Sequence, residues 1–300
     1  MSNIVIIGSG PAGVSAALYT ARAGVDTTVL TRGPGALDRA ELIQNYYGFV
    51  APISGAELER QGIEGAKAVG VKFVTTEAVG LTYTDKLTVE TLDGDYPADA
   101  VILATGASRA TPRIPGLAGL EGHGVSYCAT CDGSFFRGKI VMVVGGGNTA
   151  AADAIYLSRL AERVILVHRR DKLRATPVYH EQLTKLENVS FMWNTEVRAL
   201  RGEEGKLVSA QVEHLGDGAL ETVLVDGVFV AVGTQPNTEF LAGALPLDAG
   251  DYIAASETGE TPIPGVFAAG DVRAKALRQV VTAVSDGAVC AEQAANHVAI

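Results

Sequence analysis

Residues 3–13 have the sequence N-I-V-I-I-G-S-G-P-A-G, and this stretch decides the fold of the first part of the chain. The apolar run predicts a buried strand, and the Ala- and Leu-rich segment that continues to Gly24 predicts a helix. Between them, Gly8, Gly10 and Gly13 have the spacing G-x-G-x-x-G. The first glycine permits a tight turn, the second lets a pyrophosphate approach the backbone, and the third lets the helix pack on the strand. A glycine-rich turn can also serve only to reverse the chain, but between a strand and a helix it predicts a dinucleotide site.

Residues 139–150 repeat this plan with the sequence K-I-V-M-V-V-G-G-G-N-T-A. Gly145, Gly147 and Ala150 form a G-x-G-x-x-A variant of the same turn. In each copy a second strand follows the helix, and a later apolar strand leads into a glycine, at 100–106 and at 227–233. Helices and strands that alternate in this way predict parallel, doubly wound sheets.

The second copy is predicted to be inserted into the first. After Gly233 a Gly- and Pro-rich loop leads to a strand at 265–269 and an Ala-rich helix at 282–298, which have no counterpart in the second copy. They complete the first domain, and a chain of 300 residues exceeds the usual size of one domain. We therefore expect an α/β protein with two Rossmann-like dinucleotide-binding domains. Residues 1–111 and 243–300 form one domain and residues 112–242 the other.

Composition and termini exclude several classes of function. The net charge of −10 argues against a nucleic-acid or anionic-membrane partner, because both need clustered Lys and Arg. No stretch approaches the ~18 apolar residues of a membrane helix. The N-terminus enters a strand at once, whereas a signal peptide needs a basic start and a longer apolar run. Three cysteines do not make an extracellular disulfide framework, so we expect a cytoplasmic protein.

Basic residues follow the second strand of the second copy. Arg169, Arg170 and Arg174 lie where an NAD site normally carries a ribose-binding acid. Guanidinium groups bind phosphate oxygens two at a time, so these arginines favour NADPH over NADH; a solvated basic turn is the alternative. In the first copy Thr31 and Arg32 stand at the equivalent position, which therefore supplies no acid for the ribose.

Two cysteines lie between the two glycine-rich turns. Cys128 and Cys131 form a C-x-x-C pair, whose dithiol and disulfide forms differ modestly in free energy, so that electrons can move either way. A zinc site would need a second Cys or His pair, which the sequence lacks, and an inert buried pair would need apolar flanks. We interpret the pair as redox-active, without a metal. Asp132 is placed to exchange protons with the sulfurs or, alternatively, to cap the following turn.

Further residues have weaker signals. Asp271 follows an apolar strand and is expected to bind a ribityl hydroxyl or to stand near the phosphates. Residues 278–280 could cover the edge of a ring. Cys290 lies among Ala and Val in a predicted helix and is expected to be a small buried residue. Trp193 and the pair Tyr46-Tyr47 either stack on a ring or pack against protein.

Six motifs in this order resemble the low-molecular-weight thioredoxin reductase family over essentially the whole chain: residues 8–13, 104–107, 128–133, 145–150, 168–175 and 265–271 with 278–279. The resemblance implies FAD in the outer domain, NADPH in the inserted domain and a homodimer. It implies that electrons pass from NADPH through FAD to the cysteine pair, and then to thioredoxin or a similar small dithiol protein. It also implies that Cys131 is the sulfur nearest the flavin, with Asp132 as its acid–base partner and Asn45 beside the flavin.

The positions expected to contact the cofactors come from these motifs. They are Gly8, Gly10, Pro11, Ala12, Gly13, Asn45, Thr105, Gly106, Gly270, Asp271, Arg278, Gln279, Val280, Gly145, Gly147, Asn148, Thr149, Arg169, Arg170 and Arg174. Because the nicotinamide and the cysteine pair would both belong to the inserted domain, both must reach one flavin face. Residues 109–116 and 234–244 are therefore candidate hinges for a domain rotation.

The chain departs from the family pattern in two places. Gly35-Ala36-Leu37-Asp38 replaces a Gly-Gly-Gln-Leu segment, and Ala152-Asp153 replaces a glutamate pair, which removes a nicotinamide contact. Divergent relatives that lack the arginines take electrons from ferredoxin, so a ferredoxin-driven enzyme or a dithiol oxidase is an alternative. A flavin-bound redox sensor is a third. The intact arginines favour NADPH, and Asp132 favours an enzyme over a sensor.

Overall fold

The computed structural model describes residues 2–40, 42–83, 86–110, 112–241 and 243–299. The chain divides into two compact units, the first formed by Met1–Ser108 with Thr234–Ile300 and the second by Arg109–Gly233. The second unit is thus inserted into the first, and each contains a parallel sheet, which confirms the predicted fold class. The predicted boundary residues Thr111 and Ala242 lie outside the described residues.

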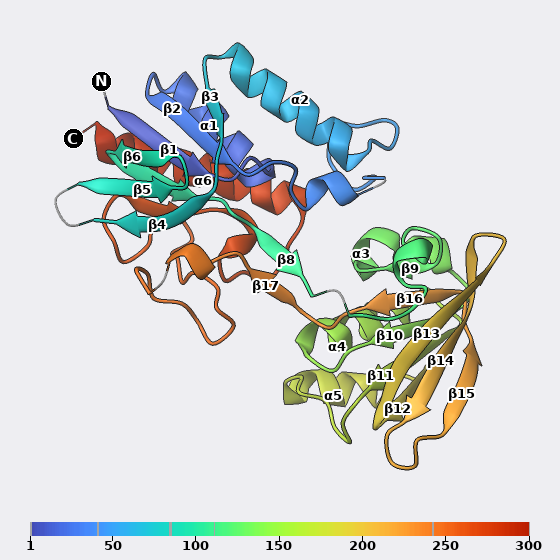
Figure 1. Ribbon diagram of the computed structural model, residues 1–300. Coiled ribbons are helices and arrows are strands. Elements are labelled where there is room, and N and C mark those ends of the chain that lie inside the picture. Colours follow the sequence, from blue (N-terminus) through green and yellow to red (C-terminus); the bar gives the residue numbers. More distant parts are fainter. Residues whose placement is uncertain (1, 41, 84–85, 111, 242, 300) are drawn as a thin grey trace. The chain divides into compact units, whose positions relative to one another are not determined.

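The described residues of the first unit form a parallel sheet, an antiparallel sheet and three α-helices, together with shorter elements (Figure 1). Its elements are β1 (Asn3–Ile7), α1 (Pro11–Arg22), β2 (Asp26–Thr31), η1 (Leu37–Arg39), α2 (Gly55–Ala68), β3 (Lys72–Thr75), β4 (Ala78–Thr82), β5 (Leu87–Thr91), β6 (Gly94–Ala98), β7 (Ala100–Leu103), β8 (Ala107–Arg109), β17 (Thr234–Pro236), η4 (Glu239–Leu241), β18 (Val266–Ala268), η5 (Gly270–Val272) and α6 (Val280–Val298).

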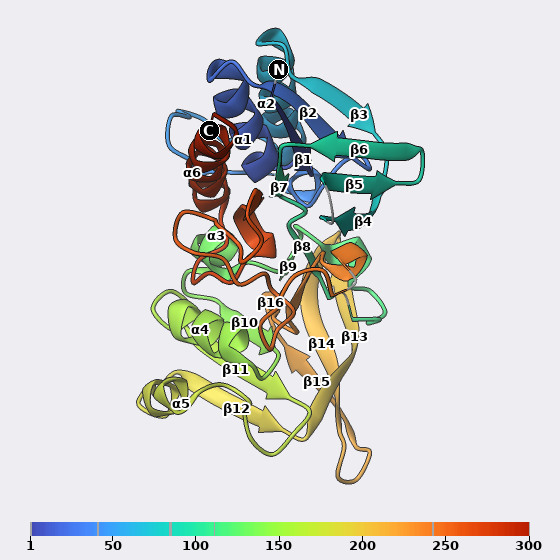
Figure 2. The same cartoon turned by 90° about the vertical axis from the view of Figure 1, so that its left-hand side faces the viewer.

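The parallel sheet of the first unit has the order β18-β7-β1-β2-β3. Its strands are apolar on both faces because both faces are covered. On one face α1 and α6 pack through small residues such as Ala16 and Ala291, which lets the two helices lie close together (Figure 2). The other face packs against the antiparallel β4-β5-β6 sheet and a segment that includes Ile253.

The second unit has the same layered plan. Its elements are η2 (Ala118–Leu120), β9 (Val125–Ser126), α3 (Ala129–Asp132), η3 (Gly133–Phe136), β10 (Ile140–Val144), α4 (Asn148–Leu157), β11 (Arg163–His168), α5 (Pro177–Leu183), β12 (Val189–Trp193), β13 (Thr195–Glu203), β14 (Lys206–His214), β15 (Leu220–Leu224) and β16 (Gly227–Val230). The parallel sheet has the order β12-β11-β10-β16-β9. Helices α3, α4 and α5 cover one face, and the antiparallel β13-β14-β15 sheet covers the other.

The segment after Gly233 belongs to the first unit, which corrects the prediction that the inserted domain extends to residue 242. Strand β17 pairs with β8 in a two-stranded sheet. Asn237 then donates from its backbone N–H to the Gly106 carbonyl at 3.0 Å and from its side chain to the Thr105 carbonyl at 2.8 Å. These hydrogen bonds hold the segment on the first unit. The composition of the segment does not predict them.

No helix in the described part of the chain is both long enough and apolar enough to cross a membrane.

Cys290 is fully buried in α6, as predicted, and its Sγ donates to the Ala268 carbonyl at 3.2 Å. Burial raises the pKa of this thiol to about 12. Because the thiolate is the reactive form, Cys290 should be inert in the folded protein.

We therefore predict that a thiol titration of the reduced, native protein counts two reactive cysteines, and that the third reacts only after unfolding in guanidinium chloride. The unfolded protein, with all three cysteines accessible, is the control. Reaction of the third thiol in the native protein at a rate similar to the other two would show that this part of the core is open.

Candidate active site

The first glycine-rich turn joins β1 to α1 at the carboxyl edge of the parallel sheet. Gly8 has φ of +111°, and a Cβ on it would overlap the Ala104 carbonyl, which follows the neighbouring strand β7. A Cβ on Gly13 would overlap the Gly8 carbonyl, whereas a Cβ on Gly10 would meet nothing within 4 Å. The N-cap Gly10 gives α1 no side-chain cap. Packing therefore fills the space beside Gly8 and Gly13. The space beside Gly10 is open, and the first N–H groups of α1 have no side-chain cap, as a pyrophosphate site requires.

Two other predicted positions lie next to this turn. A Cβ on Gly270 would approach the Ala12 Cβ to 2.8 Å, so the loop after β18 contacts the start of α1. The Thr105 hydroxyl donates to the Asn237 carbonyl at 2.8 Å, which fixes the loop after β7. The structure therefore brings Gly8–Gly13, Thr105-Gly106 and Gly270 together, at strand ends that are neighbours in the sheet. Asp271 lies 3.9 Å from the Lys275 ammonium.

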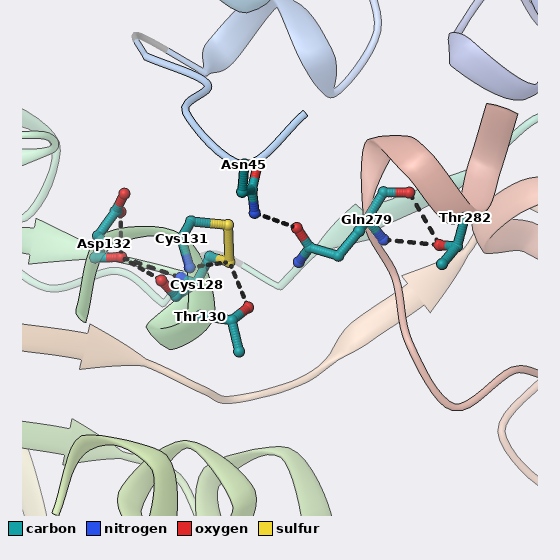
Figure 3. The surroundings of a disulfide bond; sticks show 8 residues. Asn45, Cys128, Thr130, Cys131, Asp132, Gln279 and Thr282 are labelled. Carbon is teal, nitrogen blue, oxygen red and sulfur yellow. Dashed lines mark hydrogen bonds between the residues drawn. A yellow bond between two sulfur atoms is a disulfide. The ribbon is translucent and has the colours of Figure 1, made fainter. Parts of the chain in front are cut away.

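The N-terminus of α6 gathers the remaining residues predicted for the first unit (Figure 3). Gln279 is the N-cap and forms a capping box with Thr282, and Val280 begins the helix. The Asn45 amide donates to the Gln279 Oε1 at 2.9 Å, so these two predicted residues contact each other. The Arg278 guanidinium carbon lies 4.2 Å from the centre of the Tyr252 ring.

Two features of the first copy, the missing acid at the end of β2 and the replaced segment 35–38, have local explanations. The Thr31 hydroxyl hydrogen-bonds to that of Ser9 at 2.7 Å, so this pair occupies the place of an acid at the end of β2. The replaced segment that contains Leu37 forms the short helix η1, and Gly55 at the start of α2 packs against the Leu37 carbonyl. Glu59 is buried beside Gly35, and burial raises the pKa of this carboxyl group despite a hydrogen bond from the Gly35 backbone.

The second glycine-rich turn, between β10 and α4, has the same construction. A Cβ on Gly145 would overlap the Ala231 carbonyl beyond β16, and Gly147 again faces open space at an uncapped N-terminus. The Asn148 side chain accepts from the Thr176 backbone N–H at 2.9 Å. Thr149 is exposed in the first turn of α4. The Asn148 side chain thus has a structural role in holding the loop that follows β11.

The three predicted arginines gather beside this turn. The Arg174 backbone N–H donates to the Gly146 carbonyl at 2.7 Å, which ties the basic loop to the glycine-rich turn. His168 is 6% exposed; burial and then the charges of the three arginines lower its pKa, so the imidazole is neutral. Among the described residues, no carboxylate lies within 4.0 Å of a guanidinium nitrogen of Arg169, Arg170 or Arg174. Three cationic side chains therefore act on the His168 ring, which itself lies against the turn at Gly146.

Cys128 and Cys131 are joined in a disulfide at the N-terminus of α3 (Figure 3). The Cys128 Sγ accepts from the Cys131 backbone N–H at 3.2 Å and lies 3.5 Å from the Thr130 hydroxyl. Cys131 is exposed and Cys128 half-buried. Asp132 is the N-cap of η3, but its side chain does not cap that helix. The alternative prediction of a capping role is therefore wrong.

Ser126 is the site residue that sequence reasoning missed. Its hydroxyl donates to the Asp132 Oδ2 at 2.6 Å and accepts from the Cys128 backbone N–H at 3.1 Å. Its place two residues before the first cysteine was the available signal. Trp193 stacks on Phe191, with ring centroids 4.8 Å apart and an angle of 5° between planes, so it packs against protein.

Asp153, which stands in the altered pair on α4, has its pKa raised by burial to about 7. An acid whose folded-state pKa lies above the ordinary value of 3.8 destabilises the fold once it must ionise. The cost grows from about pH 4 to pH 7 and is constant above that range.

We therefore predict that Asp153→Asn raises the free energy of unfolding by up to about 4 kcal/mol at pH 8 and by only about 1 kcal/mol at pH 4.5. Denaturant unfolding at the two pH values measures the difference. The exposed neighbour variant Arg159→Ala should show no such pH dependence. Equal stabilisation by Asp153→Asn at both pH values would mean that packing, not charge, is responsible.

Comparison with known proteins agrees with this geometry. The family described as pyridine nucleotide-disulphide oxidoreductase matches residues 2–287. A thioredoxin reductase of Listeria monocytogenes is 41% identical over 300 residues, covering 99% of this chain and 93% of the relative. One of Treponema pallidum is 41% identical over 300 residues, with 99% and 97% covered.

Solved structures give the same result. The thioredoxin reductase from Streptococcus pyogenes matches with a TM-score of 0.92 at 37% identity, covering 99% of this chain and 97% of that one. The thioredoxin reductase from Giardia duodenalis matches with a TM-score of 0.95 at 30% identity, with 100% of both chains covered. The chain therefore belongs to the pyridine nucleotide-disulphide oxidoreductases, in the branch of the low-molecular-weight thioredoxin reductases, and is a disulfide reductase that uses a flavin and a pyridine nucleotide.

Proposed function

We propose that this chain reduces the disulfide of thioredoxin, or of a similar small dithiol protein, with FAD held by the first unit and NADPH by the second. One observation carries the proposal. In the second unit, Gly145 follows β10, Arg169 follows β11 and Cys128 lies two residues beyond β9, and these strands belong to one parallel sheet. The carboxyl ends of parallel strands meet at one edge, so a nucleotide-binding turn, a cationic cluster and a redox disulfide share that edge.

FAD fits the first unit. The open backbone at Gly10 and the uncapped start of α1 would hold the pyrophosphate. Gly270 and Asp271 come from the loop that contacts Ala12 and would lie along the ribityl chain or the phosphates. Asn45, Arg278, Gln279 and Val280 would line the flavin ring, since Asn45 and Gln279 already bond to each other at the start of α6.

NADPH fits the second unit. The open turn at Gly147 would hold the pyrophosphate, with Gly145 and Thr149 beside it. Arg169, Arg170 and Arg174 would bind the 2′-phosphate, because each guanidinium group offers several donors to phosphate oxygens. The neutral imidazole of His168 packs behind these arginines without adding charge.

Flavin and nicotinamide supply hydride transfer when bound, and so provide the two electrons that open the disulfide. The remaining chemistry belongs to the chain. One cysteine thiolate attacks the partner's disulfide, the second cysteine displaces the reduced partner, and the enzyme disulfide forms again. Asp132 moves a proton to or from the sulfurs, with Cys131 as the sulfur nearest the flavin. A homodimer remains part of the proposal on the family resemblance, rotation of the inserted unit on the layout of the two sites, and a cytoplasmic location on the cysteine content.

Anaerobic addition of NADPH to the purified, flavin-loaded protein should bleach the flavin absorbance, and NADH should do so far more slowly. Oxidised thioredoxin added afterwards should restore the colour. The ratio of the two second-order rate constants measures the preference. Flavin that NADPH does not bleach, but that a ferredoxin or a dithiol reduces, would replace this function by one of the alternatives. Bleaching without reoxidation by any protein disulfide would favour a sensor.

The variant Arg170→Ala should raise KM for NADPH about 10- to 100-fold, because one charged hydrogen-bonding group to phosphate is worth about 1.5–3 kcal/mol. KM for NADH, which has no 2′-phosphate, should change less than threefold. Arg159→Ala removes an exposed arginine of the same unit outside the cluster and serves as the matched control. Equal losses with both nucleotides would indicate damage to the fold of the loop.

A further inference from the structure

Ser126 lies at the edge of the second unit's parallel sheet, where β9 pairs with β16. The register places Ser126 opposite Phe229, and an isolated bridge between Glu121 and Val125 holds the chain on the other side. The Tyr127 hydroxyl donates to the Glu121 carboxylate at 2.6 Å. Ser126 itself is 4% exposed. Its position is therefore set by backbone pairing, and its hydroxyl is withdrawn from water.

The Ser126 hydroxyl has one proton to donate. Two acceptors lie within reach, the Asp132 Oδ2 at 2.6 Å and the Cys128 carbonyl at 3.4 Å. The carboxylate is closer and charged, so the hydroxyl donates to it. The oxygen in turn accepts from the Cys128 backbone N–H at 3.1 Å. One buried hydroxyl thus joins the backbone of the first cysteine to the carboxylate that follows the second.

We propose that Ser126 is a positioning residue for proton transfer at the disulfide, holding the Asp132 carboxylate in register with Cys128. The proposal rests on the proposed function, since it concerns the exchange of electrons with a protein disulfide. The Ser126 hydroxyl bonds to the Asp132 carboxylate and to the Cys128 backbone. It acts through Asp132.

The step that Ser126 supports is the oxidation of the enzyme dithiol. One enzyme thiol loses its proton to Asp132 and attacks the partner's disulfide, whose sulfur–sulfur bond breaks. Asp132 returns that proton to the leaving sulfur, which becomes a thiol. The second enzyme thiol then gives its own proton to Asp132, and its sulfur breaks the mixed disulfide. Asp132 passes this second proton to the partner's second sulfur. Two electrons and two protons thus pass to the partner, whose two sulfurs end as thiols, and the enzyme ends as a disulfide.

Without the hydroxyl, the carboxylate would lose both its orientation and a charge-assisted donor. Loss of the hydroxyl should therefore slow proton transfer at the sulfurs and, with it, exchange with the partner's disulfide, while flavin reduction by NADPH continues. A hydroxyl that only capped the Cys128 N–H would have the same effect whether or not the Asp132 carboxylate is present.

The experiment compares Ser126→Ala, Ser126→Thr and the control Ser134→Ala, which removes an exposed serine of the same segment. The rate of thioredoxin reduction is measured at pH 7, together with anaerobic flavin reduction by NADPH. For Ser126→Ala we expect the rate of thioredoxin reduction to fall about tenfold, as expected for a lost hydrogen bond to a charged group. Ser126→Thr should largely restore this rate, and flavin reduction should be unchanged throughout.

A double-variant cycle decides whether Ser126 acts through Asp132. In an Asp132→Asn background, Ser126→Ala should cause no further loss; a full additional tenfold loss would overturn the proposal. A wild-type rate of thioredoxin reduction in Ser126→Ala would also overturn it. If Ser126→Ala does not fold, Ser126→Gly takes its place in the cycle. Failure of the unsubstituted protein to reduce any protein disulfide would instead refute the proposed function, independently of Ser126.

Discussion

Two carbonyl oxygens, those of Ala104 and Ala231, occupy the space that a Cβ would need at Gly8 and Gly145. Each contact joins the turn after a central strand to the residue beyond its neighbour, β7 in the first unit and β16 in the second. The contact can form only because the turn residue has no side chain, and it brings the helix that follows onto the sheet. The free space beside the backbone of Gly10 and Gly147 depends on this position of the helix.

The redox pair depends on the same sheet in a different way. Cys128 follows β9, a strand of two residues that is the last in the order β12-β11-β10-β16-β9. Neighbouring strands lie about 4.8 Å apart, so β11 with its arginines and β9 with its thiols are about 14 Å apart along the carboxyl edge. One rigid sheet therefore sets the spacing between the cationic cluster and the disulfide. Pairing of β9 with β16 also fixes the hydroxyl that orients Asp132.

The strongly apolar, glycine-terminated strands could be predicted from the sequence. Strand β1 was predicted because burial on both faces leaves a continuous apolar run. Helix α6 was predicted to begin two residues later than it does. Helix α2 was not predicted: it has few buried residues, and its start is set by a Ser54 cap and by contact with η1. Strand β9 was not predicted either, since two residues have no periodicity.

In the candidate site, too, some residues could be predicted from the sequence and others could not. The glycines, the cysteines and the arginines have fixed chemistry at fixed spacing, so they could be predicted. The contact between Asn45 and Gln279 and the bonds of Ser126 join residues through the fold, and no local pattern encodes them. The second boundary of the inserted unit was placed too late for the same reason, because Asn237 is held by Thr105 and Gly106, far away in the sequence.

Charge is distributed unevenly in this acidic chain. Arg60 pairs with Glu57 and Glu64, and Arg198 pairs with Glu196 and Glu213, so neighbouring carboxylates neutralise these two arginines. The cluster at Arg169, Arg170 and Arg174 has no such carboxylate partner among the described residues, and the buried imidazole beneath it is kept neutral. An unpaired cluster on a protein of net charge −10 is a local positive potential that attracts anions. Because the cluster adjoins the open turn at Gly147, that attraction acts where a phosphorylated dinucleotide would bind, and it should weaken with added salt.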